Sequence, residues 1–241
     1  MGNSPHTASI HILDDDSLLH VFYLYRPFLS GEDQDDNARL RGGDKIDSRR
    51  RWWYKPAQVC QRWRNIIFGS ASYLGIFLVC TYGTPVADML AHSPSLPLII
   101  HYATKGRVIT TDDEQGIIFA LKQRHRVLRV RLFPQGTSLQ EKFVAVMDGE
   151  YPVLEHLAIG LPAEDNSSTL ILPENLQAPH LRLLWLRGFQ FAIPMGSRLL
   201  TTAVSLVTLD LIMVHPSTYF HPNALLQWVS LMPQLETLRR S

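Results

Sequence analysis

An apolar pattern that recurs about every 27 residues constrains the fold of this chain more than any other feature. From residue 125 onward, the pattern apolar-x-x-apolar-x-apolar occurs four times and then begins again. Its members are Val127/Val130/Leu132, Leu154/Leu157/Ile159, Leu181/Leu184/Leu186, Leu206/Leu209/Leu211 and Leu235/Leu238. The first positions lie 27, 27, 25 and 29 residues apart. Such a period predicts a solenoid, because one unit cannot bury its apolar face alone and must stack on its neighbours.

Each unit is expected to begin with a short strand and to continue into an outer helix. Three units carry a proline two residues before the first apolar position, which favours extended backbone there. Helical spacing follows at 139–147, 199–204 and 225–232, whereas 164–175 has none and is expected to be an irregular crossing. Divergent first units are predicted at 74–79 and 96–102, with a short helix at 85–91. The sequence therefore predicts an α/β repeat domain over 71–241, clearest from 125 onward, with parallel strands and outer helices.

A smaller helical module is predicted at 10–70. Leu18, Val21, Phe22 and Tyr25 fall at i, i+3, i+4 and i+7, on one face of a helix that follows three aspartates and stops at Pro27. A second stripe consists of Val59, Trp63, Ile66 and Ile67. Residues 30–51 between the stripes are polar and offer too little apolar surface to offset the entropy of ordering. We therefore expect a disordered insert there.

Composition excludes several classes of partner. The 23 Lys and Arg balance 22 Asp and Glu, so no overall field attracts nucleic acid or an anionic membrane. The N-terminus lacks the basic start and apolar core of a signal peptide, and the apolar stretch 66–80 is too short to span a bilayer. The sequence thus predicts a soluble cytoplasmic or nuclear protein that binds neither nucleic acid nor membrane.

No motif for chemistry is present. The sequence contains no Walker A loop, GxGxxG, HExxH or GxSxG, and its ten histidines share no ligand spacing. Cys60 and Cys80 have no CxxC spacing and are expected to be buried thiols. We therefore predict no catalytic residue, no metal and no cofactor, and we do not expect an enzyme.

The N-terminal stripes resemble the F-box family, whose loose pattern is Leu-Pro-x-Glu-x-Leu-x-x-Ile-Phe, an interval, and then Val-Cys-x-x-Trp-Arg. This chain reads Leu13-Asp14-Asp15-Asp16-Ser17-Leu18-Leu19-His20-Val21-Phe22, and later Val59-Cys60-Gln61-Arg62-Trp63-Arg64. The second half matches better, since Asp14 replaces the family's proline and the insert enlarges the interval. With the repeats that follow, the arrangement resembles fungal F-box proteins with C-terminal leucine-rich repeats.

This resemblance implies a subunit of an SCF-type ubiquitin ligase. The F-box would dock on the Skp-type adaptor of a cullin–RING ligase, and the repeats would hold a protein substrate without performing chemistry. The adaptor-binding residues implied are Leu18, Val21, Phe22, Val59, Trp63 and Ile67, some of which must also form the module's own core. A scaffold with leucine-rich repeats and no ubiquitin role is the alternative. The repeats end without a polar cap, so a truncated product or a partner covering that end is expected.

Alternation along the strands predicts which side chains face away from the repeat core. If Leu157 and Ile159 point inward, His156 and Ala158 point outward. The equivalent outward positions are Arg129, Arg131, Phe133, Leu183, Trp185, Arg187, Thr208, Asp210 and Ile212. Aromatic residues and arginine are enriched in interface hot spots, so Phe133, Trp185 and Arg187 are predicted to bind the substrate. Alternatively, a loop or the preceding repeat covers Trp185 and Phe133.

Overall fold

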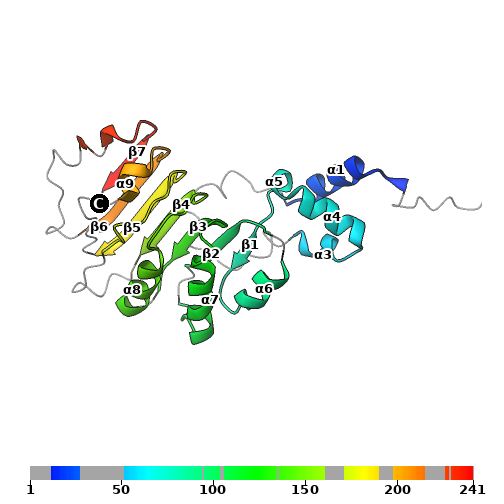
Figure 1. Cartoon of the computed structure of the whole chain (residues 1–241), viewed down its shortest axis with the longest axis horizontal. Coiled ribbons are helices and arrows are strands. Elements are labelled where there is room, and N and C mark those ends of the chain that lie inside the picture. Colours follow the sequence, from blue (N-terminus) through cyan, green and yellow to red (C-terminus); the bar gives the residue numbers. More distant parts are fainter. Residues whose placement is uncertain are drawn as a thin grey trace, which may run out of the picture. The chain divides into compact units, whose positions relative to one another are not determined.

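The computed structural model divides the chain into two compact units, Met1–Phe77 and Leu78–Ser241 (Figure 1). It describes residues 12–27, 52–93, 95–103, 106–134, 136–160, 171–189, 198–214, 226–227 and 229–240. The predicted insert at 30–51 lies outside these residues, as do residues 164–170 of the predicted crossing at 164–175. The unit boundary falls a few residues after the one at 70 that the sequence suggested.

The second unit is built on a seven-stranded parallel sheet whose strands follow one another in sequence order. The strands are β1 (Leu78–Cys80), β2 (Leu98–Tyr102), β3 (Val127–Leu132), β4 (His156–Gly160), β5 (Leu183–Phe189), β6 (Thr208–Val214) and β7 (Thr237–Arg240). The order never reverses, and β1 and β7 form the two edges of an open sheet. The predicted short parallel strands are confirmed, and the one-directional order is compatible with stacked repeats.

The strand register aligns equivalent positions of the sequence repeat. Val130, Leu157, Leu184, Leu209 and Leu238 are successive partners from β3 to β7. We call this row the leucine ladder. The first three are fully buried and Leu209 is 4% exposed, whereas Leu238 on the edge strand is 46% exposed. Each member is therefore covered by the next strand, as stacking requires.

The backbone repeats as well where the strands begin. The carbonyl of Glu155 accepts hydrogen bonds from the amides of both Arg182 and Leu183, at 2.8 and 3.1 Å. In the next two repeats, the carbonyls of Arg182 and Val207 likewise each accept hydrogen bonds from two consecutive amides. Three consecutive units thus turn into the sheet with the same hydrogen-bond pattern.

Helices occupy the connections between strands. They are α6 (Val86–His92), α7 (Thr111–Leu121), α8 (Thr137–Val146) and α9 (Arg198–Thr202). Helix α7 contacts α6, α8, β1 and β2, and Figure 1 shows α6, α7 and α8 along one face of the sheet. Helix α7 begins at a capping box, in which Thr110 and Asp113 each accept a hydrogen bond from the other's amide. The outer helices expected near 85–91, 139–147 and 199–204 are present, and α7 is an additional one.

The first unit is helical, with α1 (Asp15–Tyr25), α3 (Tyr54–Ala57), α4 (Gln61–Gly69) and α5 (Ala71–Leu74). Helix α1 begins after Asp14, whose carboxylate accepts a hydrogen bond of 2.7 Å from the Ser17 amide. That bond lowers the pKa of the Asp14 carboxyl. Helix α4 packs against α1, α3 and α5. The core of the unit consists of Leu18, Phe22, Trp53, Ala57, Ile67 and Leu74, all buried.

Candidate protein-interaction surfaces

The six residues implied in adaptor binding divide into two sets. Leu18, Phe22 and Ile67 are at most 2% exposed and form the core of the helical unit. Val21 and Val59 are 43% and 60% exposed, and Trp63 is half-buried. Only the second set is accessible to another protein in this conformation.

An aromatic contact joins the two helices that carry these residues. The Phe22 ring of α1 meets the Trp63 ring of α4 edge to face, with centroids 5.0 Å apart. On the other side of α4, the Phe68 ring packs edge to face on Trp53 at 5.6 Å. The Trp63 ring therefore holds α1 in place while remaining partly accessible.

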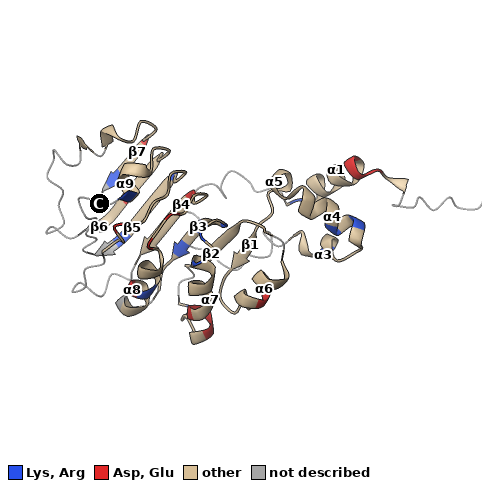
Figure 2. Ribbon diagram, viewed as in Figure 1, with Lys and Arg blue, Asp and Glu red and all other residues tan. Residues whose placement is uncertain are grey.

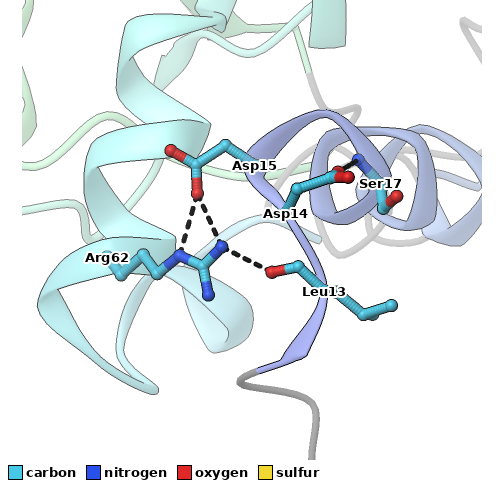
Figure 3. Close-up of polar contacts among 5 residues, drawn as sticks. All are labelled: Leu13, Asp14, Asp15, Ser17 and Arg62. Atoms are coloured by element: carbon cyan, nitrogen blue, oxygen red, sulfur yellow. Dashed lines mark hydrogen bonds and ion pairs between the residues drawn. The ribbon is translucent and has the colours of Figure 1, made fainter.

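A polar contact also fixes the start of α1 on α4 (Figure 3). The Arg62 guanidinium donates from Nε to the Asp15 carboxylate at 2.8 Å and from Nη2 to the carbonyl of Leu13 at 2.5 Å. It also forms an ion pair with Asp15, which is mostly exposed, so the pair adds little stability. Its effect is to orient the segment before α1. The apolar spacing of the two helices gave no signal for this contact, because Arg62 and Asp15 are polar and lie 47 positions apart.

Large apolar side chains remain exposed on the helical unit. On α1 alone, Val21, Leu24 and Tyr25 are more than two-fifths exposed. The predicted stripe is thus wider than the contact with α4, because Leu18 and Phe22 enter the core while Val21 and Tyr25 stay accessible. The other exposed members of the unit are Ile12, Leu13, Tyr23, Val59 and Tyr73. So many exposed apolar side chains on one small unit leave apolar surface that a partner protein can cover.

The second unit, Leu78–Ser241, contains the stacked repeats and is called the repeat unit below. Its sheet face opposite the leucine ladder carries the predicted substrate-binding residues. Arg187 is exposed and Phe133 is half-buried, but Trp185 is only 8% exposed. The Phe133 ring lies edge to face on Trp185, with centroids 5.1 Å apart. Phe133, just after β3, thus covers Trp185 while it stays half-buried itself, and Arg187 is the member most open to solvent.

Gly160 makes room for this aromatic contact, since it lies between β3 and β5 at the end of β4. A Cβ at Gly160 would lie 2.7 Å from the Phe133 ring and 3.0 Å from the Trp185 ring. We expect Gly160→Ala to separate the rings and to lower the free energy of unfolding by about 1–3 kcal/mol. Thermal denaturation and near-ultraviolet circular dichroism measure both effects.

The matched control is Gly69→Ala in α4, where a Cβ would meet no atom within 4 Å. Alanine there should leave stability unchanged or raise it, because alanine has less backbone freedom to lose on folding. A Gly160→Ala protein that melts like wild type would contradict the close approach of the two rings.

Charge on the outward face is mainly basic. Arginines occupy outward positions on β3, β5 and β7 (Figure 2). Asp210 lies in the same face, 5% exposed, with Arg239 beside it in the register. Burial raises the pKa of the Asp210 carboxyl, and the charge of Arg239 acts in the opposite direction. The face therefore suits a partner that brings negative or hydrogen-bonding groups.

Comparisons with protein-family models, with curated proteins and with solved structures each found no match. Within the described ranges, no helix is both long and apolar enough to cross a membrane. The same part of the chain holds no group of three or more His, Cys, Asp or Glu side chains placed to bind a metal ion.

Proposed function

We propose that this chain is the substrate-recognition subunit of an SCF-type cullin–RING ubiquitin ligase. The helical unit acts as an F-box that docks on a Skp-type adaptor, and the sheet is a leucine-rich-repeat solenoid that binds a protein substrate. The observation that carries the proposal is that Val21 and Val59 are exposed and Trp63 is partly exposed, all three within the F-box-like motif.

The geometry supports a docking role because the motif supplies more apolar surface than the unit buries. Helix α1 commits Leu18 and Phe22 to the core and leaves Val21 and Tyr25 in solvent. Burying exposed apolar side chains is favourable by roughly 25 cal/mol per Å² of surface. A partner that covers these side chains in a groove therefore obtains binding free energy from surface that the isolated unit leaves in water. Val59 stands just before α4, beside the half-buried Cys60.

The repeat unit suits the other half of the role. A solenoid presents an extended face from strands that contact only their neighbours, so partner-facing side chains vary without disturbing the ladder. In such a ligase the subunit acts by proximity, raising the local concentration of substrate lysines near the ubiquitin carrier. No catalytic side chain, metal or cofactor is required of this chain.

Adaptor binding by a Val59→Asp variant tests the proposal directly. We expect the wild-type chain to bind a purified Skp-type adaptor and Val59→Asp to weaken that binding at least about tenfold, because a carboxylate would be buried without a partner. The control is Val108→Asp in the repeat unit, where the valine is 68% exposed. It introduces the same charge and should leave adaptor affinity unchanged, as measured by isothermal titration calorimetry.

Two results would contradict the proposal. One is a wild-type chain that shows no affinity for the adaptor, which would favour an interaction scaffold without a ubiquitin role. The other is an equal loss of affinity in both variants, which would place the contact outside the helical unit.

A further inference from the structure

A groove with a volume of about 490 Å³ crosses the ends at which the strands begin. It is lined from Pro97, just before β2, to Gln234, shortly before β7. Adjacent strands lie about 4.8 Å apart, so a groove across six strand starts extends roughly 24 Å. We call it the strand-start groove. It is formed by different residues from Phe133, Trp185 and Arg187.

The sequence repeat builds this groove from equivalent positions. Arg126, His180 and Gln234 each precede the first apolar residue of a unit, and Glu155 and Arg182 each follow one. The carbonyl of Glu155 accepts the amide of Arg182, which places these two residues on neighbouring strands. Because equivalent positions are stacked, a ligand that lies across the strands can contact one such residue in each repeat.

The charges of the lining residues select the chemistry of the ligand. Arg126 and Arg182 are cationic, and Glu155 is the acidic member of the lining. The Arg182 side chain is exposed and has no hydrogen-bond or ion-pair partner among the residues that the structure describes. Arg126 donates from Nε to the carbonyl of Leu96 at 3.0 Å. The guanidinium of Arg182 is therefore suited to bind a carboxylate in bidentate fashion, while Arg126 adds a second positive charge to the groove.

We propose that the strand-start groove binds an extended acidic peptide whose two acidic side chains are about three residues apart. Arg126 directly precedes β3, and Arg182 directly precedes β5. These strands are two strand spacings apart, about 10 Å, and three residues of extended peptide span that distance. Glu155 lies between them and repels a third carboxylate there. Leu128 and Val153 of the lining contact the peptide's apolar side chains.

A peptide fits this lining better than nucleic acid does. Sites for single-stranded nucleic acid stack bases on large aromatic side chains, and no Phe, Tyr or Trp lines the groove among the described residues. The chain's formal net charge of +1 also gives little general attraction for a polyanion. The site does not depend on a ubiquitin role, so it can be tested separately from adaptor binding.

Selection of random ten-residue peptides displayed on phage against the whole chain tests the proposal. The expected result is enrichment of sequences with two Asp or Glu residues two to four positions apart. Synthetic versions of the enriched peptides should bind the Arg182→Glu variant at least about tenfold more weakly than wild type, because the charge reversal replaces attraction with repulsion. They should bind within twofold of wild type to the control Arg187→Glu, which reverses an exposed arginine of β5, the strand that Arg182 precedes, on the outward face.

Other outcomes would overturn the assignment. Enriched peptides without acidic residues would refute the charge argument, as would a selection that enriches none. Equal losses in Arg182→Glu and Arg187→Glu would place the peptide on the outward face. An oligonucleotide that displaces the peptide at lower concentration than the unlabelled peptide does would show a nucleic-acid site instead. Circular dichroism of each variant confirms that the fold is retained.

Discussion

Replacing Leu184 by alanine is expected to lower the free energy of unfolding of the repeat unit by about 2–5 kcal/mol. Leu184 is fully buried, with Leu157 on one side of it in the leucine ladder and Leu209 on the other. Removing its branched end leaves a cavity where neighbouring repeats meet. Because each repeat is stabilised by its neighbours, the loss weakens the interfaces of β5 with both β4 and β6.

Leu238→Ala provides the matched control, since Leu238 holds the same repeat position on β7 but is 46% exposed. Its replacement should lower the free energy of unfolding by less than about 1 kcal/mol. Urea denaturation followed by far-ultraviolet circular dichroism measures both variants. Equal losses would mean that the sequence repeat does not correspond to the stacked ladder, and the solenoid interpretation would fail.

The repeat unit was predictable from sequence because two periods agree in it. Alternation along each strand assigned Leu157 and Ile159 to one face and His156 to the other, and the longer period stacked equivalent positions. Helix α7 was missed, although Thr110 and Asp113 form a capping box that marks its start. Its sequence signal is this local capping pattern, which lies outside the apolar spacings that predicted the other helices.

The candidate sites were less predictable because accessibility depends on what packs nearby. Trp185 occupies an outward position, as predicted, yet the Phe133 ring covers it. Gly160 was the available signal, because a glycine between two strands that carry aromatic rings leaves space for them to meet. The strand-start groove gave no signal when each repeat was considered alone. It arises only when residues that flank the apolar positions of several repeats are stacked.

The helical unit shows why a motif match does not by itself separate core from surface. Helix α1 carries an apolar stripe in which Phe22 faces α4 and Val21, the preceding residue, faces solvent. Both belong to the F-box-like pattern, but a substitution at one tests folding and a substitution at the other tests binding. A prediction that contrasts the two positions can therefore distinguish a structural contribution from adaptor docking.

Phe22→Ala is expected to unfold the helical unit. It should lower the free energy of unfolding by about 3–5 kcal/mol, which is comparable to the whole stability of a unit of this size. Phe22 is 2% exposed and packs on the Trp63 ring with centroids 5.0 Å apart. The control Val21→Ala changes a side chain that is 43% exposed and should cost less than about 1 kcal/mol.

Tryptophan fluorescence during thermal denaturation separates the two outcomes, because three of the five tryptophans, Trp52, Trp53 and Trp63, lie in the helical unit. Phe22→Ala should lose the transition of that unit and, with it, adaptor binding. Val21→Ala should keep the transition and lose only affinity, since its methyl groups are available to a partner groove. If Phe22→Ala melts like wild type, the packing of α1 on α4 cannot be what sustains the unit. If Val21→Ala binds the adaptor with unchanged affinity, the exposed half of the stripe is not the docking surface, and the proposal must rest on Val59 and Trp63 alone.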